Sequence, residues 1–246
     1  MSIDHPSQLE ALKAAGKIVR MMLERMKAHV RPGVKTKELD EIGAEVMEQQ
    51  GARSAPATVY GFPGTNCISL NDEVVHGIPS KRILREGDLL KLDVTIEKDG
   101  FMADAAETVA VGNVDEVKQK LVATARNAFE KSLTAAKAGN RVMEIGRIVE
   151  REVRRNGFFV IRELEGHGIG RTIHESPSVP NFADPRARQI LKDGMVLTIE
   201  PIIAAGAGKI VLEKDGWTIR TADRSPAAHY EHTMVITAGS PILLTV

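Results

Sequence analysis

Apolar side chains recur every three or four positions in four stretches of the chain, which is the period of an amphipathic helix. The first stretch follows a capping-box spacing that begins at Ser7. Its apolar face consists of Leu12, Val19, Met22, Leu23 and Met26. The other three predicted helices begin at Thr36, after Asp115 and at Val142. The chain is therefore expected to contain at least four amphipathic helices.

Short apolar runs between these helices predict strands. The runs are Cys67–Leu70, Val196–Ile199 and Thr233–Thr237, and a longer hairpin between Leu90 and Thr108 turns at Asp99-Gly100. Residues 51–63 and the Pro-rich residues 176–185 are expected to form loops. Both halves of the chain run helices, then strands, then a Lys-Asp-Gly turn. We predict an α+β fold in which residues 1–246 form one domain, with an antiparallel sheet covered by helices.

The predicted hairpin carries a carboxylate on each strand, Asp93 and Asp104. If the hairpin loop has an even number of residues, both side chains project from the same face of the ladder. Two carboxylates among apolar neighbours would repel each other and lose hydration unless a cation lay between them. A solvated outer face of the hairpin is the alternative interpretation of this pattern taken alone.

The composition narrows the class of protein without selecting a function. The chain has 33 basic and 33 acidic residues, so no electrostatic attraction to nucleic acid or to an anionic membrane is expected. Cys67 is the only cysteine, which excludes an intramolecular disulfide and is typical of a reducing compartment. No apolar run approaches the length of a membrane span, and the N-terminus lacks the features of a signal peptide. We expect a soluble, cytoplasmic protein.

Three more polar residues stand out by their context. His167 lies in Gly-His-Gly-Ile-Gly, Glu200 ends the apolar run Met-Val-Leu-Thr-Ile, and Glu231 directly precedes another apolar run. Taken alone, each of them would be interpreted as a surface or hydrogen-bonded residue. Together with Asp93 and Asp104 they offer four carboxylates and one imidazole, which two divalent cations would balance in charge. An oxygen-rich set of this kind suits an open pair of metal ions, which favours hydrolytic chemistry.

The spacing of these residues resembles that of type I methionine aminopeptidases. The shared features are Asp-x10-Asp, then His in Gly-His-Gly-Ile-Gly, Glu in Thr-Ile-Glu-Pro and Glu in Tyr-Glu-His-Thr. Two further segments also match, Asn-Asp-Glu-Val-Val-His-Gly-Ile-Pro ending at Pro79 and Ile-Gly-Arg-Thr-Ile-His-Glu ending at Glu175. The resemblance runs from the first helix to the last strand. It implies the pita-bread fold, a pseudo-two-fold curved antiparallel sheet covered by helices.

The resemblance also implies a role for each candidate residue. Two divalent metal ions (Co, Mn, Fe or Zn) would be bound by Asp93, Asp104, His167, Glu200 and Glu231. Glu200 would carry a proton between the nucleophile and the leaving amine. His174 would hydrogen-bond the scissile carbonyl, and His76 would hydrogen-bond the amide beyond it.

The same resemblance implies an apolar pocket for the methionine side chain of the substrate. Its lining would be Val59, Phe62, Cys67, Ile173 and Trp217. This chain has Pro56, Val59 and Ile173 where several bacterial relatives have Cys, Tyr and Phe. The shape of the pocket is therefore expected to differ from that of those relatives.

The function implied is that of a metallo-aminopeptidase, a hydrolase that removes the initiator methionine when the second residue is small and uncharged. The expected substrates are N-terminal methionyl peptides and nascent proteins. The enzyme is expected to be a monomer that contacts the ribosome transiently. One alternative is an X-Pro aminopeptidase or prolidase, which has a similar ligand set and usually a separate N-terminal domain. Another is a non-catalytic binding protein on the same fold.

Overall fold

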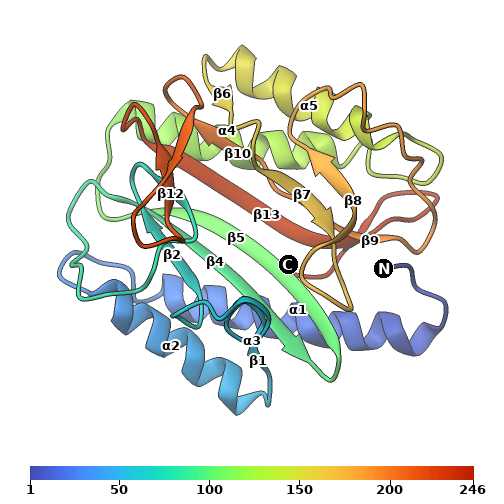
Figure 1. Cartoon of the computed structure of the whole chain (residues 1–246), viewed down its shortest axis with the longest axis horizontal. Coiled ribbons are helices and arrows are strands. Elements are labelled where there is room, and N and C mark those ends of the chain that lie inside the picture. The colour runs from blue at the N-terminus through green and yellow to red at the C-terminus, as the bar shows by residue number, and fades with distance from the viewer.

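The computed structural model describes residues 1–246 as five helices and fourteen strands (Figure 1). The helices are α1 (Pro6–Lys27), α2 (Thr36–Gln49), α3 (Ala55–Tyr60), α4 (Glu116–Ser132) and α5 (Val142–Arg155). The strands of the first half are β1 (Arg53–Ser54), β2 (Cys67–Leu70), β3 (Glu73–Val75), β4 (Leu89–Lys98) and β5 (Phe101–Ala110). Those of the second half are β6 (Phe159–Val160), β7 (Glu165–Gly168), β8 (Glu175–Pro180), β9 (Val196–Ile199), β10 (Ile202–Ala204), β11 (Ile210–Leu212), β12 (Ile219–Thr221), β13 (Ala227–Val235) and β14 (Ile242–Leu243).

One antiparallel sheet runs through both halves of the chain. Its main path is β1-β4-β5-β13-β9-β7-β8, so β5 and β13 join the half before α4 to the half after it. Figure 1 shows α1 and α2 along the first half of this sheet, at the bottom of the view, and α4 and α5 along the second half, at the top. The helix α1 packs on β4 and β5, and α4 packs on β13. The α+β prediction is confirmed, and each half consists of a helix pair on central strands.

Each helix pair buries its apolar stripe against its own half of the sheet. In the first half, Val19, Met22 and Met26 of α1 share a core with Leu92 and Val94 of β4. In the second half, a separate core joins residues of α4 and α5 to β9 and β13; it includes Phe129, Ile145, Leu197 and Met234. Burial of such side chains contributes about 1.5–3 kcal/mol each. With the helices thus fixed on one face of the sheet, polar side chains can gather on the other.

The seam between β5 and β13 is short, and at each end a threonine hydroxyl bonds to the backbone of the other strand. Three residue pairs join the strands, and Ala106 lies opposite Glu231 in the middle pair. At one end the Thr233 hydroxyl accepts from the Asp104 amide (2.9 Å) and donates to the Asp104 carbonyl (2.8 Å). At the other end the Thr108 hydroxyl does the same for His229, at 2.8 Å in both bonds. A local two-fold axis through the middle pair therefore relates Asp104 to His229.

Several predicted boundaries were wrong. The first helix begins at Pro6 with His5 as its N-cap rather than at Ser7, because proline is well suited to the first turn. The expected loop 51–63 contains α3, which Ser54 caps and Gly61 ends with a φ of 74°. The central strand β13 starts at Ala227, six residues before the expected Thr233.

The Pro-rich residues 176–185, expected as a loop, contribute most of strand β8. This strand pairs only with β7 and forms the edge of the sheet. Proline lacks a backbone N–H and is tolerated on an edge, where that donor is not needed for a ladder. Pro177 and Pro180 therefore do not prevent β8 from forming. No helix in this fold combines the length and the apolar character that crossing a membrane requires.

Replacing Gly16 with Ala is expected to destabilise the protein. Helix propensity alone predicts a gain of about 1 kcal/mol. However, a Cβ at Gly16 would lie 2.0 Å from the backbone oxygen of Leu244, and the backbone has little freedom to retreat. We expect a net loss of about 1–3 kcal/mol in the free energy of unfolding, measured by urea denaturation. Lys17→Ala, at the exposed neighbouring position, serves as the control and should change stability by less than about 0.5 kcal/mol. An unchanged or increased stability of Gly16→Ala would contradict the close packing of α1 on the C-terminal segment.

Candidate metal centre

The strand register places three of the predicted ligands on one face of the sheet. Asp93 on β4 lies opposite Ala106 on β5, and Ala106 lies opposite Glu231 on β13. Residues directly opposite each other in an antiparallel ladder project to the same face. Asp104 is two positions from Ala106 and shares that face. The expected convergence of Asp93 and Asp104 agrees with this register, and the small Ala106 side chain leaves space between Asp93 and Glu231.

The second half of the chain brings the remaining two predicted ligands to the same place. Glu200 directly follows β9, which is paired with β13 through His232↔Ile199. The next step of that ladder would place Glu200 opposite Glu231. His167 on β7 donates its amide N–H to the Thr198 hydroxyl of β9 at 3.2 Å. Donors from four neighbouring strands and one strand end thus meet on one face.

A cavity of about 170 Å³ encloses these groups. It is lined by all five predicted metal ligands, by His76 and His174, and by four of the five predicted pocket residues, Phe62, Cys67, Ile173 and Trp217. Val59 is the exception. It is 43% exposed and does not line the cavity, whereas Pro56 and Tyr60 of the same short helix do. The cavity is the place where the two halves of the chain meet.

The carboxyl groups in this cavity are buried and repel one another. Burial raises the pKa of Asp104, and the nearby Glu231 raises it further. Burial likewise raises the pKa of Glu200, with Asp93 adding to the effect. The pKa of Glu231 rises to about 8 because of burial and the charge of Glu200. One oxygen of Asp104 and one of Glu231 are buried without any hydrogen-bond partner. Buried carboxylates without partners are the arrangement that a bound cation stabilises, so this donor set fits divalent metal ions.

His167 is prepared to act as a neutral nitrogen donor. Its Nδ1 lies 3.0 Å from the Gly168 carbonyl oxygen, which can only accept, so Nδ1 carries the hydrogen and Nε2 keeps its lone pair. Burial, with a contribution from His174, lowers the pKa of His167 to about 4. A neutral imidazole of this kind is a common metal ligand near pH 7.

Two more histidines lie at the edge of the cavity. His76 directly follows β3 with a φ of 57°, a conformation that is uncommon for residues other than glycine. The next residue, Gly77, lies so close to β2 that a Cβ there would be 2.4 Å from the Ile68 carbonyl oxygen. His174 is at the mouth of the cavity. Its ring centroid is 4.4 Å from that of His167, and its Nδ1 is 2.6 Å from the Tyr60 hydroxyl.

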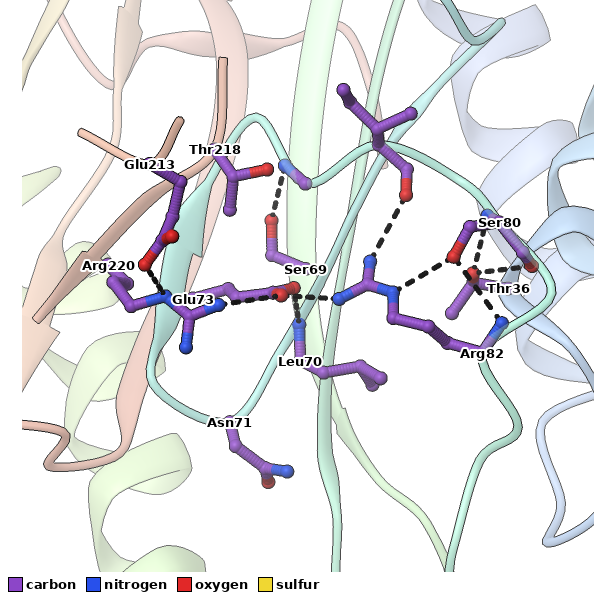
Figure 2. A network of polar contacts seen from close by, with 12 residues as sticks. Thr36, Ser69, Leu70, Asn71, Glu73, Ser80, Arg82, Glu213, Thr218 and Arg220 are labelled. Atoms are coloured by element: carbon purple, nitrogen blue, oxygen red, sulfur yellow. Dashed lines mark hydrogen bonds and ion pairs between the residues drawn. The ribbon is translucent and has the colours of Figure 1, made fainter. Parts of the chain in front are cut away.

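The apolar wall of the cavity is held by a network of charged residues. Trp217 meets Phe62 edge to face, with ring centroids 5.3 Å apart. It belongs to the turn between β11 and β12, and β12 pairs with β3. Figure 2 shows the Glu73 carboxylate of β3 between the guanidinium groups of Arg82 and Arg220, the latter on β12. These ion pairs fix the hairpin that carries Trp217 to the strand that precedes His76.

Several residues that line the cavity were not predicted from the sequence, among them Tyr60, Thr95 and His229. The period of a strand was the signal that could have found two of them. Thr95 is two positions after Asp93, and His229 is two positions before Glu231, so each shares a face with a predicted ligand. His229 was missed because the strand was expected to begin at Thr233. Tyr60 was missed because the short helix α3 was expected to be a loop.

A buried cluster of carboxylates and imidazoles, on a sheet face shielded by helices behind it, is typical of metal-dependent hydrolases. The chain belongs to metallopeptidase family M24, whose model matches residues 10–238. "Methionine aminopeptidase 2" of Bacillus subtilis is 47% identical over 100% of this chain and 99% of its own length.

Comparison of structures gives the same result. A methionine aminopeptidase from Thermotoga maritima superimposes with a TM-score of 0.96 at 36% identity, covering 100% of this chain and 99% of that protein. A prolidase from Pyrococcus furiosus has a TM-score of 0.78 at 21% identity, covering 99% of this chain and 65% of the prolidase, and shares the fold alone. The predicted pita-bread fold is confirmed by these matches.

The raised carboxyl pKa values predict how the metal-free protein responds to pH. Unfolded, Glu231 ionises near 4.5; folded, it ionises near 8. Between these values the folded protein keeps a proton that the unfolded chain releases, so a rise in pH favours unfolding through this group. In Glu231→Gln this contribution is absent. The variant should therefore become progressively more stable than the wild type as the pH rises from about 5 to about 8.

The experiment is a comparison of melting temperatures in chelator across this pH range. The comparison with the variant is needed because His167, His232 and Lys91 have lowered pKa values and act in the opposite sense in both proteins. Glu10→Gln, at an exposed position, is the control and should follow the wild type. A difference between Glu231→Gln and the wild type that stays constant with pH would contradict the assigned electrostatics.

Proposed function

We propose that this protein is a methionine aminopeptidase that binds two divalent metal ions through Asp93, Asp104, His167, Glu200 and Glu231. The observation that carries the proposal is the convergence of these five donors in one cavity, where carboxylate oxygens lack partners. Relatives that are 38–47% identical over nearly their full lengths are named methionine aminopeptidases. The prolidases and an X-Pro aminopeptidase match at 20–22% identity and support the fold only.

The charge and grouping of the donors support two ions rather than one. Four carboxylates carry four negative charges, which two divalent cations would neutralise. The donor atoms fall into two compact groups, Asp104 with His167 and Glu231, and Glu200 with His229 and Glu231. Glu231 belongs to both groups and would lie between the ions. Mn, Fe, Co and Zn all accept mixed carboxylate and imidazole ligands.

Divalent ions held by these five residues would lower the pKa of a water molecule and would polarise the carbonyl of the first residue. Glu200, whose pKa is raised by burial, accepts the proton of that water at a carboxylate oxygen and passes it to the leaving nitrogen. His174 hydrogen-bonds the scissile carbonyl from the mouth of the cavity, and Tyr60 orients its ring through Nδ1. His76 hydrogen-bonds the amide that follows.

The pocket for the methionine side chain would be formed by Phe62, Cys67, Ile173 and Trp217. The thioether of methionine is flexible and makes favourable contacts with aromatic rings, which the Phe62–Trp217 pair offers. Tyr60 takes the place expected for Val59. The limited space in the cavity favours substrates whose second residue is small and uncharged. We propose nascent cytoplasmic proteins as the substrates, approached by a monomer in transient contact with the ribosome.

A peptide assay separates this function from the alternatives. With Mn²⁺, Co²⁺, Fe²⁺ or Zn²⁺ added to chelator-treated protein, Met-Ala-Ser should be cleaved and Ala-Pro peptides should not. Without metal, neither peptide should be cleaved. Preferential cleavage of Ala-Pro would indicate an X-Pro peptidase. Turnover of neither peptide by folded, metal-loaded protein would indicate a binding protein.

Replacing His174 with Ala should lower kcat for Met-Ala-Ser by about 10²–10³-fold, because a hydrogen bond to the developing oxyanion is lost. Metal content, measured by elemental analysis, should stay at the wild-type level, because His174 is not among the proposed ligands. Tyr60→Phe is the matched control. It removes only the hydroxyl that orients the ring and should cause a smaller loss. A metal-free His174→Ala protein would show that this histidine binds metal.

A further inference from the structure

His229 is a buried histidine that lies beside Glu200 and Glu231 but is not among the five ligands that the sequence motifs indicate. It lies on β13, two positions before Glu231, and its side chain is 2% exposed. Both ring nitrogens are buried without a hydrogen-bond partner. A buried polar group in this state destabilises the fold, so such a side chain is expected to have a partner that the protein chain does not supply.

The position of the ring indicates what that partner is. Nε2 of His229 lies 3.2 Å from Oε2 of Glu200 and 3.3 Å from Oε2 of Glu231, without the alignment of a hydrogen bond to either oxygen. Donor atoms that bind one metal ion at about 2.1 Å and at right angles lie about 3 Å apart. Both separations from Nε2 therefore match those between ligands of one ion, and donor atoms of the three residues all lie within 4.8 Å of one another.

The local symmetry of the sheet supports the same conclusion. The two-fold axis through the Ala106–Glu231 pair relates His229 to Asp104, and each is held by a threonine hydroxyl bonded to both its amide and its carbonyl. The ladder between β5 and β13 thus positions Asp104 of β5 on one side of Glu231 and His229 of β13 equivalently on the other side.

We propose that His229 is a sixth metal ligand, which binds through Nε2 the ion shared with Glu200 and Glu231. This inference rests on the dinuclear centre of the proposed function. The centre then contains two imidazoles, His167 and His229. Imidazole favours Fe, Co, Ni and Zn over the harder Mg and Ca, so His229 raises the affinity of the centre for the later transition metals.

The test is nuclear magnetic resonance of wild-type protein labelled with ¹⁵N-histidine and titrated with Zn²⁺ from zero to two equivalents. Long-range ¹H–¹⁵N correlations report each imidazole ring separately. The ring nitrogens of His167 and His229 should both shift to values typical of metal-bound nitrogen, while those of His232 should not. His232 is the internal control because it lies on the same strand but is bonded to Thr245 and Tyr230. Single His→Gln variants assign the signals.

Calorimetry provides a second measurement. His229→Gln should keep the wild-type circular dichroism spectrum and weaken one of the two Zn²⁺ binding events by at least about 10–100-fold. The matched variant His232→Gln should bind Zn²⁺ as the wild type does. A wild-type spectrum in which zinc shifts only His167 would overturn the assignment of His229 and leave the proposed function intact. Wild-type protein that binds no Zn²⁺, Mn²⁺ or Co²⁺ would overturn both.

Discussion

The repulsion among buried carboxylates is the interaction on which the rest of this structure depends. Asp93, Asp104, Glu200 and Glu231 share a small cavity, and burial and neighbouring negative charge oppose the ionisation of Asp104, Glu200 and Glu231. A fold that gathers such groups must hold them by stronger forces elsewhere. Here the helix pairs supply those forces, because their apolar faces bury large cores on the sheet. Bound cations reverse the sign of the electrostatic term, so the same arrangement that burdens the metal-free protein stabilises the metal-loaded one.

The sheet solves the geometric part of the problem. Antiparallel strands with a fixed register align side chains in rows about 5 Å apart, which is close enough for neighbouring carboxylates to share an ion. Ala106 is the small residue that keeps the row open between Asp93 and Glu231. Loops, the short helix α3 and the β11–β12 hairpin then add His76, His174 and aromatic residues that line the rest of the cavity. One cavity thereby combines metal-binding donors fixed on the strands with an apolar wall that the β11–β12 hairpin holds in place.

Much of this centre followed from the sequence, and the failures have physical causes. Asp93 and Asp104 were predictable because Asp99-Gly100 fixes a two-residue turn and hence the register of β4 against β5. The convergence of residues from both halves depended on recognising a family pattern, since pairing between distant strands leaves no local signal. His229 was overlooked because β13 begins in polar and small residues that do not read as a strand. Val59 was expected to line the cavity, but Tyr60 does so instead, because the short helix α3 determines which of these side chains faces inward.

The short seam between β5 and β13 has a consequence for the motions of the protein. Asp93 and Asp104 come from the strands before the seam, and His167, Glu200, Glu231 and His229 from those after it. Three residue pairs and two threonine hydroxyls join β5 to β13, and the pairing of β3 with β12 is a second junction between the halves. If the proposed ions bind, donors from both halves would hold them, and the ions would link the two halves across this line. Amide hydrogens along β5 and β13 should consequently exchange with solvent far more slowly in the metal-loaded protein than in the metal-free protein. Those of α1 and α4, which lie within single halves, should respond less.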